Sequence, residues 1–560
     1  MPQKNIFRSP PILTAAHCFP VAGTIRTDDK RIIALYHHAC QFIDIPGIWE
    51  GLFRIACLTK NNPLEESVTK KILQAIEENP AGSFPGSISE QISIARAAFA
   101  LFEYCTDRKI LKRIALWLRY LENEYDRLSI QNHILFSPAD LMELLIRFYQ
   151  ISRTKTALRL CDRIRMDAYD WTTALHTLKQ SVSIHKESDN ILFESEFRSP
   201  PEIDYDTRQK MLNHAELLAD GVRFTLFAGM FSGHKQDLKA GKTAWDYLLK
   251  YHHAVCGGTT GNPYLCGSAS DQPVSSRVLC EWTEAFASQM VLPDSEWALE
   301  ELIRVVFNGM EDILTYNDAP DILYVNTVGE EDLRSKDPAA LYARLTRAVA
   351  SCFSHAVSLA EKGIRINYLL SARFLVKTGE GSLLIDSDPY NICFRCKKPS
   401  SVPIDLFHSL TENDNTRFIH AGEKVEITKT HINQHNTGYI KTSFILHNGD
   451  SFQIIPDGRI LSETIHHQGL IFIKDKRLLC AAATRDDFSM AVCGMPEMNG
   501  EEIFITVART DEWKLKGNQP DDIPVLPQTD NHVFRNSLIS YAGTRHRITV
   551  FPRSKNQCLK

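Results

Sequence analysis

The chain has 560 residues, of which 44% are hydrophobic, 23% charged and 9% aromatic; 63 Lys and Arg against 68 Asp and Glu give a formal net charge of −5. These proportions are typical of a soluble globular protein. The small net charge, with no long Lys/Arg run, argues against nucleic acid or a membrane surface as a partner. The sequence does not fix an oligomeric state, and a homodimer stays open.

The beginning of the chain carries Lys4 and Arg8 but lacks the apolar run that a secretory signal needs. No segment approaches the roughly 20 apolar residues of a membrane-spanning helix. The 14 cysteines are an ordinary number for this length, and we expect reduced thiols rather than a disulfide framework. We therefore expect a cytoplasmic protein, with residues 1–29 as an N-terminal extension.

Residues 30–362 have helical apolar spacing almost throughout. One stripe is Ile110, Ile114, Trp117, Leu118 and Leu121, at i, i+4, i+7, i+8 and i+11. The pair 137–138, Ser-Pro, predicts the start of another helix, and Asp294 is expected to cap a later one. A series of helices without intervening strands argues against a parallel α/β fold and leaves a bundle, a solenoid or a closed toroid. Because no fixed-period repeat is present, we predict an (α/α)6 toroid rather than a solenoid.

Residues 363–560 change to an apolar period of two. Ile503-Phe504-Ile505-Thr506-Val507 and Leu470-Ile471-Phe472-Ile473 read as strands, and Asn448-Gly449-Asp450 is a hairpin signal. We predict an antiparallel β-sandwich domain over this range. The fold class is therefore mainly α with β, in two main domains.

The stretch 252–284 is the densest polar and glycine-rich interval. Gly257 and Gly258 permit the tight turns of a binding loop. The alternative is a long surface connection without a ligand.

This interval and its flanks also carry a family resemblance. The segments are Gly257-Gly258-Thr259-Thr260-Gly261, Glu281-Trp282-Thr283 and Phe307-Asn308-Gly309, with weaker matches at Asp140-Leu141-Met142-Glu143, Val222-Arg223 and Leu323-Tyr324-Val325-Asn326. In order and spacing they resemble glycoside hydrolase family 127, the β-L-arabinofuranosidase family. That family has a Gly-Gly-x-Gly loop, a Glu-x-Cys helix and a helix ending in Tyr-Asn-Gly. The resemblance extends over about residues 30–510.

The resemblance implies a helical toroid with a β-sandwich that cleaves a terminal furanoside with retention. In the family a zinc-bound cysteine thiolate is the nucleophile and a glutamate is the acid/base, and zinc lowers the pKa of the thiol. Here only Glu281, at the zinc-binding glutamate, and Tyr324 match. The cysteine two residues later is Thr283, and the family's cysteine pair falls at Ala340-Leu341. Because the chain contains no Cys-Cys, we expect no cofactor, with a rebuilt zinc site as the open alternative.

Carboxylates are the simplest replacement: one protonated as the acid, another as base or nucleophile. The candidates are Glu281, Asp271 near the family's acid/base glutamate, and Asp140 and Asp220, where the family has histidines. Each could instead be a helix cap or a solvated side chain.

A sugar's C–H face packs on aromatic rings, and Tyr324, Tyr264 and Trp282 are the candidates, although Trp282 could equally be a core residue. With Gly257 and Gly258 they complete the expected substrate site. We predict an exo-acting glycoside hydrolase on a small glycoside or oligosaccharide. The alternative is a non-catalytic carbohydrate-binding or scaffold relative.

Overall fold

The computed structural model describes most of the chain from residue 19 to residue 554. The described residues are 19–20, 25–78, 82–128, 137–178, 211–267, 272–292, 294–316, 319–324, 335–360, 363–378, 381–396, 404–409, 417–420, 423–424, 428–430, 437–442, 448–455, 459–465, 469–482, 490–510, 525–526, 528–542, 544, 547–551 and 553–554.

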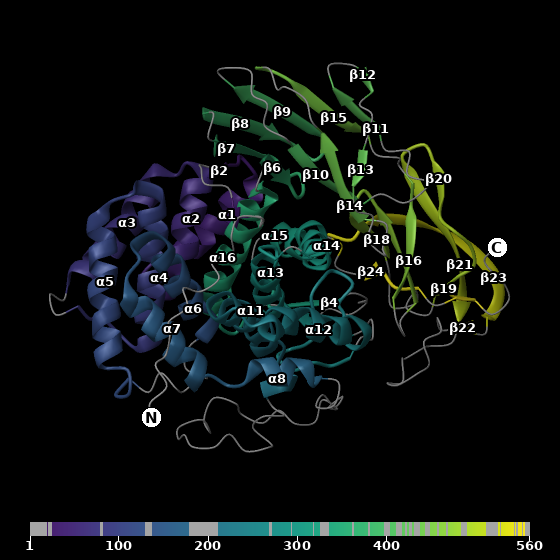
Figure 1. Cartoon of the computed structure of the whole chain (residues 1–560). Helices are drawn as coiled ribbons and strands as arrows, with labels where there is room; N and C mark the ends of the chain where they lie inside the picture. The colour runs from purple at the N-terminus through teal and green to yellow at the C-terminus, as the bar shows by residue number, and fades with distance from the viewer. Residues whose placement is uncertain are drawn as a thin grey trace.

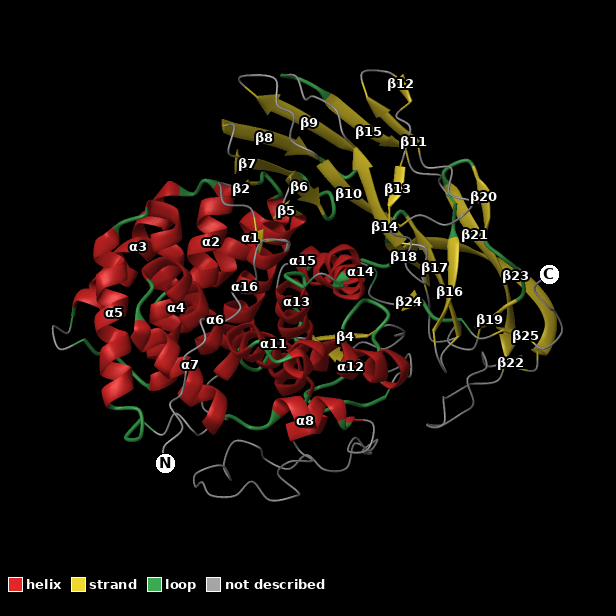
Figure 2. Cartoon of the chain, in the orientation of Figure 1, coloured by secondary structure: helices red, strands yellow, loops and turns green. Residues whose placement is uncertain are grey.

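Helices dominate the first two thirds of the chain (Figures 1 and 2). The described α-helices are α1 (Lys30–Ala39), α2 (Trp49–Thr59), α3 (Asn62–Glu77), α4 (Ile88–Cys105), α5 (Arg108–Asn123), α6 (Pro138–Ser152), α7 (Lys155–Asp167), α8 (Trp171–His176), α11 (Ala215–Ser232), α12 (Lys235–Tyr251), α13 (Ser276–Gln289), α14 (Glu296–Arg304), α15 (Glu311–Thr315) and α16 (Pro338–Ala356). Two short 3₁₀ turns, η1 (Cys40–Phe42) and η2 (Pro46–Ile48), join α1 to α2.

Six of these helices form a closed ring. In the order α2, α4, α6, α11, α13 and α16 each contacts the next, and α16 contacts α2. Other helices pack outside this ring: α3 against α2 and α4, α7 against α6, α12 against α11 and α14 against α13. The six ring helices therefore present one face to the middle of the ring and another to an outer layer.

Local sequence explains where these helices begin and which face they bury. The predicted stripe on α5 is buried at all five positions. Ser137 caps α6: its hydroxyl accepts a hydrogen bond from the Asp140 amide at 3.1 Å, and Pro138 occupies the first turn. Both predictions are confirmed.

A helix follows the position predicted from Asp294, but Asp294 is not its cap. Ser295 is the N-cap of α14, and the helix continues as a π-helical turn, η3 (Val305–Met310), before α15. A π turn inserts an extra residue between hydrogen-bonded groups, so it shifts the apolar spacing without an obvious marker in the sequence.

The remaining third consists mainly of strands. These are β5 (Val357–Ala360), β6 (Gly363–Ile366), β7 (Ala372–Thr378), β8 (Gly381–Ser387), β9 (Asn391–Cys396), β10 (Ile404–Ser409), β11 (Arg417–His420), β12 (Glu423–Lys424), β13 (Thr428–Thr430), β14 (Thr437–Thr442), β15 (Ser451–Ile455), β16 (Leu461–Ile465), β17 (Gly469–Lys474), β18 (Arg477–Ala482), β19 (Met490–Val492), β20 (Glu497–Asn499), β21 (Glu502–Thr510), β22 (Val525–Leu526), β23 (Gln528–Ser540), β24 (Arg547–Ile548) and β25 (Arg553–Ser554). The strands predicted at 470–473 and 503–507 are confirmed as parts of β17 and β21.

The strands form three larger sheets rather than a simple pair. Their orders are β1-β5-β6-β10-β14-β13, β12-β11-β15-β9-β8-β7-β2, and a third from β16 to β22 that contains β21 and β23. Most neighbours are antiparallel, but β6 and β10 are parallel, as are β19 and β25. The third sheet also has an apolar cluster of its own, with Phe472, Val507 and Phe551 at its centre.

The N-terminal residues take part in these sheets. β1 (Phe19–Pro20) pairs with β5, and β2 (Ile25–Arg26) pairs with β7. A separate extension over 1–29 therefore does not describe residues 19–26, and the strand region begins at Val357, directly after α16, rather than at residue 363.

Within the described residues, no helix combines the length and apolar composition needed to cross a lipid bilayer.

Candidate active site

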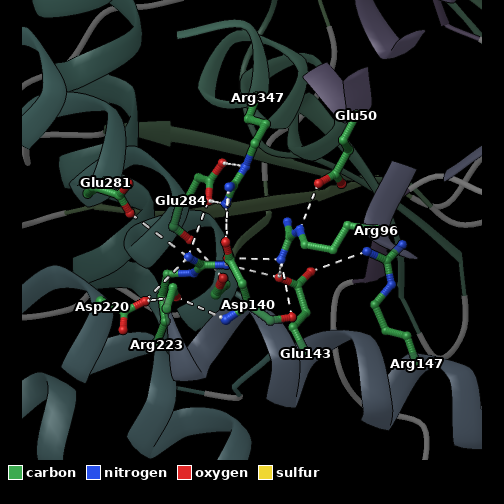
Figure 3. Close-up of polar contacts among 12 residues, drawn as sticks. Glu50, Arg96, Asp140, Glu143, Arg147, Asp220, Arg223, Glu281, Glu284 and Arg347 are labelled. Atoms are coloured by element: carbon green, nitrogen blue, oxygen red, sulfur yellow. Dashed lines mark hydrogen bonds and ion pairs between the residues drawn. The ribbon is translucent and has the colours of Figure 1, made fainter. Parts of the chain in front are cut away.

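Charged residues run along the inner faces of the ring helices. Helix α11 carries Glu216, Asp220 and Arg223, at i, i+4 and i+7. Helix α13 repeats this spacing with Arg277, Glu281 and Glu284. Residues three and four apart lie on one face of a helix, so each helix directs a polar stripe towards its neighbours (Figure 3).

Two further ring helices complete the charged cluster. Helix α6 contributes Asp140 and Glu143, and α16 contributes Arg344 and Arg347, each pair three residues apart. Carboxylates and guanidinium groups from four helices thus meet in the middle of the ring, where unpaired charges would be costly.

Asp140 lies at the centre of this network. Its carboxylate accepts hydrogen bonds from Arg96 and Arg347, both at 2.9 Å, and from Arg223 at 2.8 Å. Although burial alone raises the pKa of Asp140, the three guanidinium groups together hold it well below its ordinary value. Asp140 is therefore a fixed anion that neutralises arginines, and it cannot supply a proton near neutral pH.

The network continues along the ring through alternating charges. Arg96 donates to Glu50 at 2.7 Å and to Glu143 at 3.2 Å. Arg147 joins Glu143 at 3.2 Å and also pairs with Glu103. These ion pairs link α2, α4 and α6. They fix how the three helices pack and do not supply a reactive group.

Asp220 has a different environment from Asp140. Its partners are the hydroxyl of Ser137, which donates to Oδ1, and Arg223, whose Nη1 lies 3.9 Å from that oxygen. Burial, with the nearby Asp140 charge, outweighs these partners and raises the pKa of Asp220 to about 6. Asp220 can therefore exchange a proton near neutral pH.

Glu281 is the second carboxyl group with a raised pKa. Its Oε1 lies 2.9 Å from Nε of Arg344, and its Oε2 lies 4.0 Å from Nη1 of Arg223. Burial raises the pKa of Glu281 to about 7; Arg344 opposes this shift and Glu284 adds to it. A carboxyl group at this pKa is partly protonated at neutral pH and can act as an acid.

Arg223 connects the two carboxyl groups. Asp220 Oδ1 and Glu281 Oε2 lie 3.9 and 4.0 Å from the same Nη1 atom, so these oxygens are at most about 8 Å apart. A distance within this limit is compatible with the separation of about 5 Å between the two carboxyl groups of retaining glycosidases. It is also compatible with the lower part of the roughly 6.5–9.5 Å range of inverting glycosidases. Nη1 of Arg223 is buried, and within the described part of the chain no acceptor meets it with hydrogen-bond geometry; the nearest carboxylate oxygen is Oε2 of Glu284 at 3.3 Å.

One side of the cluster is open to solvent. The side chains of Arg344 and Arg277 are 32% and 29% exposed, whereas Glu281 is 13% and Asp220 10% exposed. Glu281, which is paired with Arg344, therefore lies next to the partly exposed part of the cluster.

Structural comparison identifies the fold. A solved structure described as a glycoside hydrolase matches with a TM-score of 0.70 and 12% identity, covering 98% of this chain and 100% of its own. A GH127 β-arabinofuranosidase matches with a TM-score of 0.63 and 11% identity, over 96% and 98% of the two chains. The chain is similar in fold to glycoside hydrolase family 127, GH127.

A GH127 β-L-arabinofuranosidase from Geobacillus stearothermophilus adds a third match, with a TM-score of 0.62 and 13% identity over 94% of each chain. No protein-family model and no curated protein sequence matches the chain. At these identities the likeness establishes the GH127 fold, and the chemistry has to be argued from the residues of the site.

The structure places the expected aromatic residues in different surroundings. Trp282 is fully buried; its Nε1 donates to Thr259 at 2.9 Å, and its ring packs on Trp245 and Phe286. The expectation that a sugar stacks on Trp282 does not fit this position, because neither ring face is free.

Tyr264 is half-buried, and its ring packs edge-on against His214, the N-cap residue of α11. It therefore lies at the same end of α11 as Glu216. Tyr324 is in β4 (Ile322–Tyr324), where its backbone is paired with Pro273 of β3 (Pro273–Ser275), and its side chain is not described. Asp271 lies outside the described residues.

Gly257 and Gly258 shape the backbone of the loop. Their φ angles are +103° and +74°, and a Cβ on Gly257 would lie 2.4 Å from a methyl group of Val305. Both residues are buried. They hold the loop against η3 and α13, so their effect on a ligand would be indirect.

The described residues do not fit the zinc site of GH127 enzymes. Among them no three His, Cys, Asp or Glu side chains are grouped to hold a metal ion. Burial raises the pKa of Cys352 to about 12; burial and the carboxylates of Glu281 and Glu284 raise the pKa of Cys280 further. Without a metal, burial therefore disfavours the thiolate form that zinc binds. Thr283 donates its hydroxyl to Leu279 O of its own helix at 2.7 Å.

The arginines and Glu284 are the site residues that were missed from the sequence. A usable signal exists: α11 and α13 are largely buried, and each carries three charged residues at i, i+4 and i+7. Charged residues at helical spacing on an otherwise buried helix indicate a polar interior. The partners of each charge come from distant segments, such as α6 and α16, and spacing alone does not pair them.

Proposed function

We propose that the protein is an exo-acting glycoside hydrolase that cleaves a terminal sugar, a β-L-arabinofuranoside or a similar unit, from a small glycoside or oligosaccharide. In this proposal the helical ring is an (α/α)6 toroid, the strand region serves as its β-sandwich part, and the substrate enters on the side of Arg344 and Arg277. The reaction uses carboxyl groups and proceeds without zinc.

One observation carries the proposal. Asp220 and Glu281 come from adjacent ring helices, have side chains that are only 10% and 13% exposed, and lie 3.9 and 4.0 Å from the same Nη1 atom of Arg223. Glycoside hydrolysis needs two carboxyl groups in different protonation states on either side of the scissile bond. The raised pKa values of about 6 and about 7 fit those two roles.

The two groups divide the roles according to their pKa. Glu281, with the higher pKa, donates its proton to the leaving-group oxygen. Asp220, ionised first, acts as the nucleophile or as the base that activates water. Arg223 stabilises the negative charge that each carboxyl group carries in turn.

The proposal is tested by assaying aryl furanosides and pyranosides with the wild type, Glu281→Gln and Asp220→Asn. We expect at least one substrate to be turned over by the wild type and each variant to lose about 100-fold or more in kcat. NMR of the first-formed anomer then distinguishes retention from inversion. The matched control is Asp237→Asn, because Asp237 is a buried acid on the outer helix α12, paired with Thr172 and Arg165.

Turnover that is unaffected by both substitutions would remove these carboxyl groups from the mechanism. If the wild type cleaves none of the glycosides but binds an oligosaccharide in calorimetry, the non-catalytic carbohydrate-binding alternative replaces the hydrolase.

A further inference from the structure

We propose that the guanidinium group of Arg344 takes over the part that zinc plays for the corresponding glutamate in GH127 enzymes, so that Arg344 is the positioning residue for Glu281. The kinetic part of this inference rests on the proposed function, whereas its structural part does not. It concerns the cation that holds Glu281, not the identity of the catalytic pair.

The contacts of Arg344 are those of a bridging cation. Its Nε lies 2.9 Å from Glu281 Oε1, and its Nη1 donates to Oε2 of Glu216. One guanidinium group on α16 therefore ties together carboxylates from α13 and α11. A planar guanidinium group with several donors in fixed directions suits this role better than a lysine ammonium group.

Arg344 also comes from the helix where the metal ligands would be expected. The GH127 resemblance places the family's cysteine pair at Ala340-Leu341, and Arg344 follows Ala340 by four residues, about one helical turn, on α16. The side chains at 340 and 341 are aliphatic and the third ligand position is Thr283. The same helix therefore supplies a positive charge in place of anionic ligands.

A guanidinium group and a zinc ion are alternatives at this position. Arg344 already neutralises Glu281 and Glu216, and Arg223 and Arg347 contribute two more positive charges nearby. A divalent cation would be repelled by these guanidinium groups. The carboxylates of Glu281, Glu216 and Glu284 are already paired with guanidinium groups, so a zinc ion would have to displace an arginine to gain an anionic ligand.

The arrangement also orients Glu281. Because Oε1 is held by Arg344, Oε2 is the oxygen that faces Nη1 of Arg223. Asp220 contacts the same Nη1 atom. Arg344 thereby leaves Oε2 of Glu281 facing the guanidinium group that Asp220 also faces.

The first experiment measures metal directly. The wild-type chain is dialysed against zinc, freed of excess, and analysed by elemental mass spectrometry, and its thermal unfolding is followed with and without a chelator. We expect far less than one zinc per chain and no change in the unfolding temperature with the chelator. One zinc per chain, together with an unfolding temperature lowered by the chelator, would overturn the inference.

The second experiment tests positioning. We expect Arg344→Met to lower kcat about 100-fold with KM nearly unchanged, and Arg344→Lys to recover part of that loss because it restores the charge. Arg165→Met is the matched control, since Arg165 is exposed to a similar degree and pairs with a buried acid on the outer layer. Wild-type kcat in Arg344→Met would overturn the positioning role.

A double-mutant cycle keeps the inference testable if the wild type cleaves no glycoside. Urea unfolding of the wild type, Arg344→Met, Glu281→Gln and the double variant measures the coupling between the two residues. We expect Arg344→Met to lower the urea midpoint and the added Glu281→Gln to recover part of the loss. Purely additive effects would overturn the pairing, whereas a coupled pair in an inactive protein would contradict only the hydrolase proposal.

Discussion

Asp140 and Asp220 show how much the neighbours of a carboxyl group decide its chemistry. Both are aspartates on ring helices and both are buried. Asp140 faces three arginines and has a lowered pKa, whereas Asp220 has a serine hydroxyl and one more distant arginine and has a raised pKa. The number of cations in contact, rather than burial, separates the structural acid from the reactive one.

Asp220→Asn should stabilise the protein at pH 8 while it abolishes turnover. At this pH the wild-type carboxylate is ionised in a buried position, which the raised pKa shows to be unfavourable. A shift from the ordinary value of 3.8 to about 6 corresponds to about 3 kcal/mol, of which we expect about 1–2 kcal/mol to be recovered by the amide. Urea unfolding at pH 8 and at pH 4 checks this, because the gain should disappear at the lower pH.

The pH profile of kcat/KM should be bell-shaped with a narrow maximum between pH 6 and pH 7. Below about pH 6 Asp220 becomes protonated and loses its role as base or nucleophile, and above about pH 7 Glu281 loses the proton that it donates. A plateau that extends from pH 5 to pH 9 would contradict these assignments. Both limbs of the profile should be measured as kcat/KM, because its pH dependence reports the pKa values of the free enzyme.

At the scale of elements, the polar stripes explain why the ring helices lie in fixed rotational positions. Each stripe must meet opposite charges on both neighbouring helices, as Arg223 of α11 does with Asp140 and Glu143 of α6 and with Glu284 of α13. Apolar packing alone tolerates small rotations, but an unpaired buried charge costs several kcal/mol. The charges therefore specify the register of the ring.

Asp140→Asn should destabilise the protein more than any single substitution at a partly exposed residue of the site. The substitution leaves Arg96, Arg223 and Arg347 facing a neutral amide, and removing one partner of a buried ion pair costs about 3–5 kcal/mol. Chemical denaturation of this variant beside Asp44→Asn, at an exposed pair with Lys71, provides the comparison. Similar losses in both variants would contradict the central role of Asp140.

The π-helical turn η3 connects the ring to the third sheet. Asn308 in this turn accepts a hydrogen bond from the Leu478 amide at 2.7 Å and donates to the carbonyl of Lys476 at 3.3 Å. Both partners belong to the hairpin that joins β17 and β18. The Phe-Asn-Gly segment that marked the family resemblance therefore acts as a contact between the helical and strand regions.

Asn308→Ala should loosen this contact without changing the catalytic pair. We expect a loss of about 1–3 kcal/mol, because a buried backbone amide is left without its acceptor. Hydrogen exchange should increase at the β17–β18 hairpin and stay unchanged in α11 and α13. Increased exchange throughout the ring would show that the contact supports the whole molecule instead.

At the scale of the whole molecule, the sequence predicted the order of helices and strands better than their connections. The α5 stripe, the α6 cap and the β17 and β21 strands follow from local patterns, and each is confirmed. The pairing of β2 with β7 joins residues about 350 positions apart, and a two-residue strand has no periodicity to detect.

For the candidate site, too, the sequence predicted individual residues better than their contacts. Asp140, Asp220 and Glu281 were selected by position in the chain, and the structure brings all three into one charged cluster. Their separate environments depend on Ser137, Arg223 and Arg344, which lie at the N-terminal end of α6, on α11 and on α16. For Trp282 the sequence left a ligand-facing ring and a core residue open, and the structure shows the core residue; one helical residue in an apolar segment does not indicate which aromatic neighbours cover it.

The charge network within the ring also limits how this sequence can change over evolutionary time. Because Asp140 serves three arginines at once, replacement of any one of them alters the charge balance felt by the other two. Neutral drift at these positions should therefore proceed through paired exchanges of acid and base, and homologues should show correlated substitutions across α4, α6, α11 and α16. A single-site change would have to pass through a less stable intermediate, so we expect the interior of the ring to change more slowly than the surface of the molecule.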